Sequence, residues 1–168
     1  MRPHRTTVIT AVSAAAAIAG ILASTSHAVA DPRCRDIDAT ISDRVVDQGC
    51  PAPTTVCVIG TVRGKHGFDG TTVFVLGSRG QAPPTAPDQR PVTGTITYSF
   101  GHGTTLTALE TSIGNVDTTT GEGHAGGTQT ITGGTGRYEG ATGYAYLAQH
   151  YEVDHFVTDI TGEVCRAR

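Results

Sequence analysis

From Thr55 to the C-terminus, β-branched residues alternate with other residues in short runs that end at Gly, Pro or Asp. In the clearest run, residues 92–100, one face carries Val, Gly, Ile, Tyr and Phe, and the other carries Thr and Ser. Successive side chains of a strand point to opposite faces, so this run predicts a half-buried β-strand. Further runs bring the predicted total to about seven or eight strands: residues 55–63, 71–78, 104–113, 124–132, 141–151 and 153–164.

These predicted strands favour an all-β fold. The expected architecture is a closed antiparallel barrel of eight strands, or of seven to eight by the count of predicted runs. No helix longer than two turns is predicted among them, which excludes a parallel sheet with crossover helices. An open sheet of this size would expose two strand edges that invite aggregation, and closure removes both edges. A small barrel has an interior that side chains fill or that holds one small ligand. We expect the barrel domain to span residues 54–168.

The first thirty residues have the three parts of a secretory signal peptide. A basic start at Arg2 and Arg5 precedes an apolar run over residues 8–23, and residues 28–30 give the small-x-small pattern of a signal peptidase site. A retained membrane anchor would need a run of about 20 apolar residues, and polar residues interrupt this one at 24–27. We therefore expect removal of residues 1–30 and secretion of the remaining chain, as an extracellular protein.

The cysteines agree with export to an oxidising compartment. All four lie after the expected cleavage site, and an even number in an exported chain predicts two disulfides. No pair has the C-x2-C spacing that zinc sites favour. Three pairings are open, and the favoured one joins Cys34 to Cys50 and Cys57 to Cys165. In that pairing, residues 31–53 form an N-terminal strap tied down by a disulfide, and the second bridge fastens the first long strand to the last.

The charge balance excludes the nucleic-acid-binding class. Twelve basic residues stand against fifteen acidic ones, and lysine occurs only at Lys65. Such a chain cannot supply the row of phosphate contacts on which nucleic-acid affinity depends. No second apolar stretch follows the signal segment, so we expect no membrane association after its removal. The single lysine among many Ala, Gly, Thr and Arg indicates a GC-rich bacterial source.

One segment resembles a known family. Residues 131–144 read Ile-Thr-Gly-Gly-Thr-Gly-Arg-Tyr-Glu-Gly-Ala-Thr-Gly-Tyr, which resembles the I-x-G-G-T-G-(R/K)-(F/Y)-x-x-A-x-G segment of plant dirigent proteins and of the related allene oxide cyclases. The resemblance implies an antiparallel barrel of the allene oxide cyclase and dirigent type, often oligomeric, with a central apolar cavity. Some members of that family direct the coupling or cyclisation of a reactive small molecule by confining it. Glycines allow a tight reversal that Arg137 and Tyr138 can hold, so the segment predicts a barrel corner more directly than a catalytic site.

Six side chains are candidates for lining a pocket inside the barrel. Tyr98 and Phe100 extend the apolar face of their predicted strand, and Glu110 shares a face with Leu106 and Ala108. A carboxylate on an apolar face is desolvated, which raises its pKa and suits it to carry a proton. Alternatively, Glu110 lies near the strand end and reaches water. The other three candidates are Tyr144, Tyr146 and His150, which share one face of a later predicted strand. Both faces of that strand carry apolar and polar residues, so the sequence leaves open which face points inward.

Two functions from different classes are consistent with these patterns. The first is a secreted barrel that binds a small apolar or aromatic molecule and directs its coupling or cyclisation without a cofactor, by confinement and proton transfer. The second is a non-catalytic extracellular structural or interaction module whose barrel is filled by its own side chains. No metal site is expected, because only a fold could bring several of the scattered histidines together. A second copy of the chain is a further partner that the family resemblance suggests.

Overall fold

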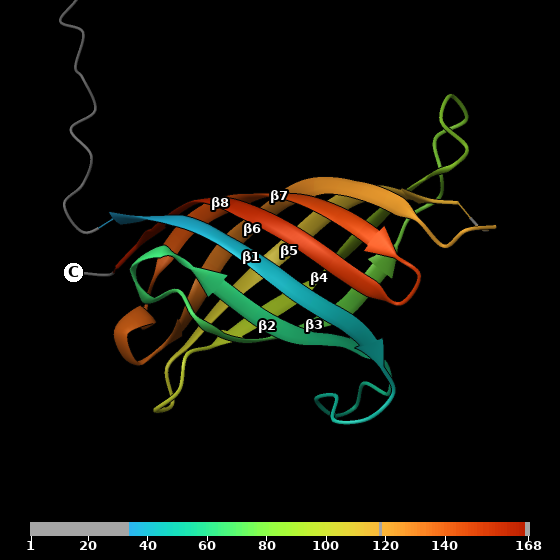
Figure 1. Cartoon of the computed structure of the whole chain (residues 1–168). Coiled ribbons are helices and arrows are strands. Elements are labelled where there is room, and N and C mark those ends of the chain that lie inside the picture. The colour runs from blue at the N-terminus through green and yellow to red at the C-terminus, as the bar shows by residue number, and fades with distance from the viewer. Residues whose placement is uncertain (1–33, 118, 167–168) are drawn as a thin grey trace, which may run out of the picture.

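The chain folds into a closed antiparallel β-barrel of eight strands. The computed structural model describes residues 34–117 and 119–166, and Figure 1 shows the strands wound around one interior. Each strand pairs with the next along the chain, and β8 pairs with β1 to close the barrel. The all-β barrel expected from the sequence is therefore confirmed. The strands are β1 (Cys34–Val46), β2 (Cys57–Gly64), β3 (Gly70–Arg79), β4 (Gln89–Ser99), β5 (Thr105–Val116), β6 (Gly123–Thr135), β7 (Thr142–Glu152) and β8 (His155–Cys165).

Residues 34–46 form a full barrel strand, and the expectation of an N-terminal strap is wrong for them. This strand, β1, pairs with β2 on one side and with β8 on the other. Ile37, Ala39 and Ile41 point inward and are buried, whereas the residues between them are exposed. Such alternation is that of a half-buried strand. The expected signal peptide, residues 1–30, lies outside the described residues.

The two disulfides join the cysteines in a different pairing from the favoured one. Cys34 bonds to Cys165, its direct partner across the β1–β8 pair. Cys50 bonds to Cys57, so this bridge closes only the short connection between β1 and β2. The expected bridges, Cys34 to Cys50 and Cys57 to Cys165, are wrong because β1, and not β2, lies beside β8. A bridge does fasten the first strand to the last, with β1 as the first strand.

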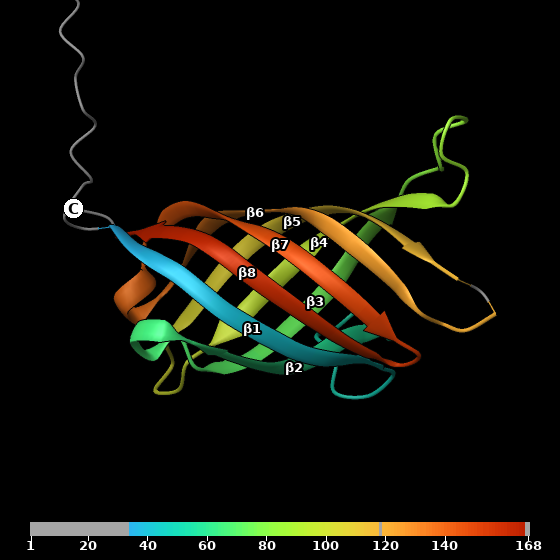
Figure 2. The same ribbon diagram turned by 45° about the horizontal axis from the view of Figure 1, so that its top comes forward.

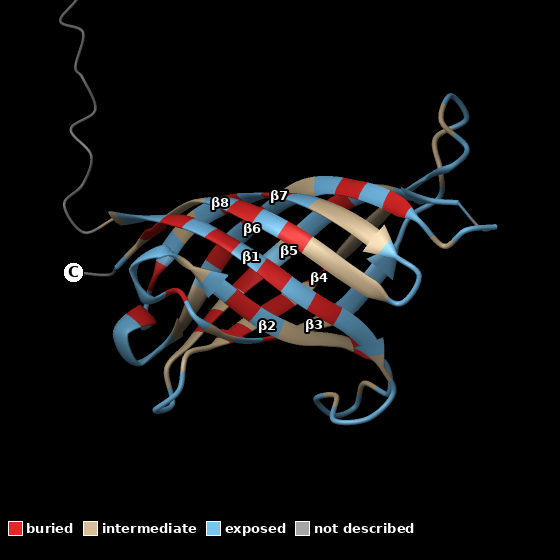
Figure 3. Cartoon of the chain, in the orientation of Figure 1, coloured by how far each residue is buried: buried red, intermediate tan, exposed pale blue. Residues whose placement is uncertain are grey.

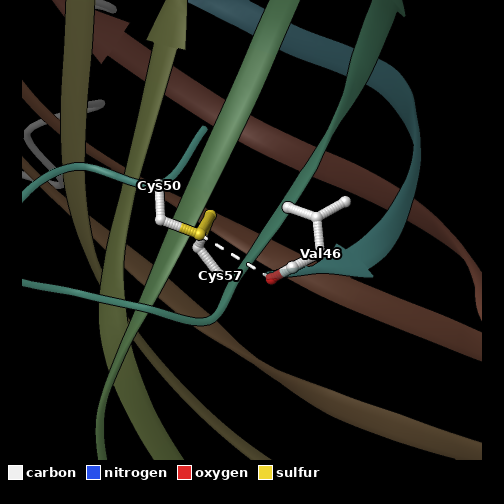
Figure 4. The surroundings of a disulfide bond; sticks show 3 residues. All are labelled: Val46, Cys50 and Cys57. Atoms are coloured by element: carbon white, nitrogen blue, oxygen red, sulfur yellow. Dashed lines mark hydrogen bonds between the residues drawn. A yellow bond between two sulfur atoms is a disulfide. The ribbon is translucent and has the colours of Figure 1, made fainter. Parts of the chain in front are cut away.

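The Cys50–Cys57 bridge holds the β1–β2 connection against the barrel (Figure 4). Cys57 is the first residue of β2 and is buried. The sulfur of Cys50 lies 3.7 Å from the carbonyl oxygen of Val46, the last residue of β1. Each disulfide therefore ties together chain segments at the end of a strand.

The two ends of the barrel differ in character. At one end, which we call the aromatic end, the 3₁₀ turns η1 (Lys65–Gly67) and η2 (Gly136–Tyr138) lie near the start of β1 and the end of β8 (Figure 2). The ring of Phe100 lies 5.0 Å from that of Phe68 and 5.2 Å from that of Tyr138. The opposite end, which we call the loop end, carries the β1–β2, β3–β4, β5–β6 and β7–β8 connections. The buried apolar core comprises Ile37, Ala39, Ile41, Val62, Phe68, Ile96, Tyr98, Leu106, Ala108, Ile131, Tyr138, Ala141, Ala145, Leu147, Ile160 and Val164.

The segment at residues 131–144 forms the corner between β6 and β7 at the aromatic end. Gly136 has a φ of 60°, a left-handed conformation that glycine adopts at little cost. Arg137 donates a hydrogen bond of 3.2 Å from Nη2 to the carbonyl oxygen of Gly67, and its guanidinium lies 5.4 Å from the centre of the Phe100 ring. Tyr138 is buried, so the barrel corner that the segment predicts is confirmed. Within the described ranges, no helix is long and apolar enough to cross a membrane.

Candidate functional site

The inward face of the barrel changes from apolar to polar toward the loop end. On β1 the inward position after Ile41 is Asp43, and on β5 the inward position after Ala108 is Glu110. Buried polar groups cost free energy unless they are hydrogen-bonded, so a group of them inside a barrel needs a physical explanation. The inward polar side chains, which we call the polar interior cluster, are Asp43, Thr72, Tyr98, Glu110, Ser112, Gln129, Gln149 and Thr158.

A hydrogen-bonded chain of three side chains crosses this cluster. The hydroxyl of Tyr98 donates to Oε1 of Gln129 at 2.6 Å, and Nε2 of Gln129 donates to Oε2 of Glu110 at 2.9 Å. Tyr98 and Gln129 are only 1% and 2% exposed, and Gln129 is the direct partner of Glu110 in the β5–β6 pair. An amide oxygen accepts and an amide NH2 donates, so Gln129 fixes the direction of the whole chain. Glu110 consequently presents one carboxylate oxygen to Gln129 and keeps the other for a further partner.

Two buried polar atoms of the cluster have no hydrogen-bond partner among the described residues. They are Oδ1 of Asp43 and Oγ1 of Thr72, in side chains that are 7% and 2% exposed. Gly60 on β2 lies between these two residues, as the partner of Asp43 in β1 and of Thr72 in β3. A Cβ atom at Gly60 would lie 2.2 Å from Cβ of Asp43, so any side chain at this position would clash with Asp43. An unpaired buried polar group costs about 1–3 kcal/mol, which a ligand that forms hydrogen bonds would recover.

Burial raises the pKa of both carboxyl groups in the cluster. The pKa of Asp43 rises to about 7, first because burial desolvates the charged form and second because Glu110 is negative. Burial also raises the pKa of Glu110, against the opposing effect of the hydrogen bond from Gln129. The pKa of Tyr98 is raised, mainly by burial, so its hydroxyl stays protonated. Near neutral pH, Asp43 is present in both protonation states, which suits it to give or take a proton.

The cluster is reached from the loop end. Glu110, Gln149, Tyr151 and Phe156 face inward and are partly exposed, whereas the inward residues nearer the aromatic end are buried. Figure 3 shows this distribution of buried and intermediate positions along the strands. The rings of Tyr151 and Phe156 pack edge to face with their centres 5.2 Å apart. An aromatic wall therefore stands beside the carboxyl groups on the side from which a ligand would enter.

The structure brings together only part of the expected pocket. Tyr98 and Glu110 belong to one hydrogen-bonded chain, with Gln129 between them. The sequence left two positions open for Glu110, a desolvated one inside the barrel and one that reaches water. The structure shows part of each, because burial raises the pKa of Glu110 while its side chain is still partly exposed. Phe100 instead lies in the aromatic end, where its ring stacks on that of Tyr98 at 6.3 Å. It therefore packs beneath the polar cluster and does not face the carboxyl groups.

Tyr144, Tyr146 and His150, three pocket candidates on a strand whose inward face the sequence left open, lie on the outer wall of the barrel. Tyr144 and Tyr146 are 45% and 58% exposed, and the side chain of His150 is 43% exposed. The inward residues of β7 include Ala145 and Leu147, which are buried. Both faces of β7 are mixed in sequence, so its orientation follows from the register against β6 and β8.

Asp43, Thr72 and Gln129 are site residues that the sequence analysis missed. Asp43 continues the alternation of buried residues along β1. Had residues 34–46 been predicted as a strand, the same alternation would have predicted that Asp43 faces inward. Thr72 and Gln129 lie among polar residues in the sequence. Only the closed barrel shows which face of β3 and which face of β6 points inward.

A hollow of about 540 Å³ lies over β1, β2 and β3. It includes Ser42 and His155, whose Oγ and Nε2 atoms are 3.1 Å apart. The alternation of these strands places most of its side chains on the outer wall, and two members of the polar interior cluster, Asp43 and Thr72, also contribute to its lining. Its lining residues are Ser42, Asp43, Arg44, Gly49, Ile59, Gly60, Thr61, Thr71, Thr72, Val73 and His155.

Comparison with known proteins adds no assignment to this site. No family model matches the chain, and no curated protein matches it.

Proposed function

We propose that this chain is a secreted barrel that binds a small molecule in the loop-end half of its interior and exchanges protons with it. The observation that carries the proposal is a pair of atoms without a hydrogen-bond partner in the described part of the chain, Oδ1 of Asp43 and Oγ1 of Thr72, buried in the same interior as Glu110. Proteins rarely leave buried polar atoms unpaired, and perturbed carboxyl groups concentrate at functional sites. A ligand hydroxyl or amine would supply the missing partner.

The walls of the site favour a particular kind of ligand. Tyr151 and Phe156 offer an aromatic surface at the entrance, and Asp43 and Glu110 offer acceptors deeper inside. An anionic ligand would be repelled by these carboxyl groups, since like charges repel strongly where water is excluded. The preferred ligand is therefore a neutral molecule with an aromatic or apolar body and a hydroxyl or amine group.

The chemistry that the site could supply by itself is proton transfer. Glu110 would accept a proton from the bound hydroxyl, while protonated Asp43 would return one to another atom of the ligand. Such an exchange suffices for an isomerisation or a cyclisation, because no electrons are added or removed. Coupling of two molecules by oxidation would need an oxidant from outside the barrel, and the interior would then only orient the partners.

Two further features support an exported ligand-binding barrel. Two disulfides suit an oxidising compartment, and the first thirty residues have the pattern of a signal peptide. The corner at residues 131–144 resembles that of dirigent proteins and allene oxide cyclases, barrels that act by confining a small molecule. A dirigent-like or allene-oxide-cyclase-like function is therefore the more specific form of the proposal.

One observation favours the alternative of a non-catalytic structural or interaction module. The half of the barrel nearer the aromatic end is filled by its own apolar side chains, including Phe68, Phe100 and Tyr138. If water and side chains filled the other half as well, no space would remain for a ligand. The two functions therefore differ in what occupies the interior around Asp43 and Thr72.

Protein-observed NMR distinguishes these functions. A panel of neutral phenols, aromatic alcohols and aromatic amines is titrated into the protein, and the side-chain amide signals of Gln129 and Gln149 report on the interior. We expect at least one compound to shift these signals saturably, with weaker binding by Asp43→Asn and by Glu110→Gln. The matched control is Tyr146→Phe, which changes an exposed hydroxyl on the outer wall and leaves the affinity unchanged. If every compound leaves both amide signals in place, the filled-barrel module is the correct description.

A further inference from the structure

A second group of functional side chains lies on the outer wall of β6 and β7. His124 and His150 are direct partners in the β6–β7 pair, and the alternation of both strands points them away from the interior. Their Nδ1 atoms are 3.4 Å apart, and their ring centres are 4.8 Å apart. Neither histidine belongs to the polar interior cluster, so the proposed function makes no use of this arrangement.

The distance between the two Nδ1 atoms fits two ligands of one zinc ion. Zinc binds histidine nitrogens at about 2.0–2.1 Å with tetrahedral angles, which places two such nitrogens about 3.3–3.4 Å apart. The observed separation is 3.4 Å. Ligands at right angles, as in a square-planar copper site, would lie about 2.9 Å apart. The same contact is a long hydrogen bond between the two rings when one Nδ1 carries a proton, and a metal ion would take the place of that proton.

Glu152 is placed to support His150 as a metal ligand. Nε2 of His150, the nitrogen that does not face His124, lies 3.6 Å from Oε1 of Glu152. A ligating histidine carries its proton on the other nitrogen and turns it toward a carboxylate or a carbonyl oxygen. Glu152 therefore favours the tautomer that leaves Nδ1 of His150 free for a metal. Its negative charge also favours a nearby cation.

The surrounding wall leaves room for an ion. The next outward positions away from the loop end are Gly126, two residues after His124, and Ala148, two residues before His150, and they are direct partners of each other. Both are exposed, and their small side chains do not cover the space in front of the histidine pair. Coordination positions not filled by His124 and His150 would therefore face solvent.

We propose that His124 and His150 form a zinc-binding site on the outer wall of the barrel, with Glu152 as the supporting carboxylate of His150. Water fills the remaining coordination positions. Two protein ligands make this site weaker than a structural site with four, and the bound ion links β6 to β7 near the loop end. The two histidines are 26 residues apart in sequence, so their spacing gave no indication of a metal site.

Calorimetric titration with zinc chloride at pH 7.5 tests the proposal. The protein is the disulfide-bonded chain from residue 31 onward, made without a histidine tag. We expect one zinc ion per chain, at least tenfold weaker binding by His124→Ala and His150→Ala, and about tenfold weaker binding by Glu152→Gln. The matched control is His102→Ala, which removes an exposed histidine at the aromatic end and leaves the zinc affinity unchanged.

NMR of the histidine rings provides an independent readout. Zinc should shift the ring signals of His124 and His150 and leave those of His66 and His102 in place. The proposal is overturned if wild type binds no zinc, if the double variant of His124 and His150 binds it as tightly as wild type, or if zinc saturates without moving the two ring signals. Both histidines are on the outer wall, and circular dichroism checks that each variant is folded. Should one alanine variant unfold, His124→Asn decides the question in its place.

Discussion

Replacement of Asp43 by asparagine tests whether this carboxyl group is desolvated and unpaired inside the barrel. Asparagine keeps the size of the side chain and removes its ionisation. In the folded protein the pKa of Asp43 is about 7, whereas its ordinary value is 3.8. Between these two pH values the folded state binds more protons than the unfolded state, so the free energy of unfolding falls as the pH rises. The stability contributed by protonated Asp43 is therefore present below about pH 4 and lost above about pH 7.

The size of this effect follows from the same two values. The difference between about 7 and 3.8 corresponds to about 4 kcal/mol. Burial also raises the pKa of Glu110, so its ionisation lowers the stability in the same direction. Asp43→Asn should match wild type near pH 4 and exceed its free energy of unfolding by up to about 4 kcal/mol near pH 8. For a domain of this size, that difference raises the melting temperature by about 12 °C.

Urea denaturation followed by circular dichroism between pH 4 and pH 8.5 measures the effect. Other carboxyl groups also influence the pH dependence, so the informative quantity is the difference between Asp43→Asn and wild type at each pH. Asp36→Asn is the matched control, because it makes the same substitution at an exposed position of the same strand and so separates the effect of burial from that of the substitution itself. A stability difference for Asp43→Asn that stays flat across this range, or that favours wild type at pH 8, would show that the Asp43 carboxyl group is not desolvated.

The remaining predictions concern the bridges and the interior. Loss of the Cys34–Cys165 bridge through a double alanine variant should lower the free energy of unfolding by about 5 kcal/mol, because the bridge spans 131 residues. Loss of the shorter bridge, which spans 7 residues, should cost only about 2 kcal/mol in the same urea experiment. Equal losses from the two bridges would contradict the expected dependence of the stabilisation on loop length. Tyr98→Phe leaves Oε1 of Gln129 buried without its donor, so it should destabilise the fold by about 1–3 kcal/mol. An unchanged melting temperature in Tyr98→Phe would show that water replaces the lost hydroxyl.

Much of the fold was predictable because the strands alternate strictly. Residues 92–100 show this most clearly, and the observed strand β4 (Gln89–Ser99) covers nearly the same range. The strand β1 was missed because prolines and cysteines near residues 31–53 suggested a strap, although Ile37, Ala39 and Ile41 alternate with polar residues. The cysteine pairing depends on which strand lies beside β8, and that neighbour is known only once β1 is recognised as a strand.

The candidate site was predictable only where a strand has one clearly apolar face. Tyr98 and Glu110 follow apolar residues of the same parity, and both are in the interior. Tyr146 shares a strand with two mixed faces, so its outward direction follows from register alone. Asp43 and Gln129 belong to the site because of their neighbours on other strands. The alternation within a single strand does not predict such neighbours.

The proposed function requires a carboxyl group that is desolvated inside the barrel and has room for a partner. The most direct test is a pH titration of the Asp43 side-chain carbon by carbon-13 NMR, in the presence and absence of a bound ligand from the panel. We expect a midpoint near pH 7 in the free protein, and a change in that midpoint when the ligand binds beside the carboxyl group. A midpoint near the ordinary value of 3.8, unaffected by ligand, would contradict a desolvated Asp43 beside the ligand.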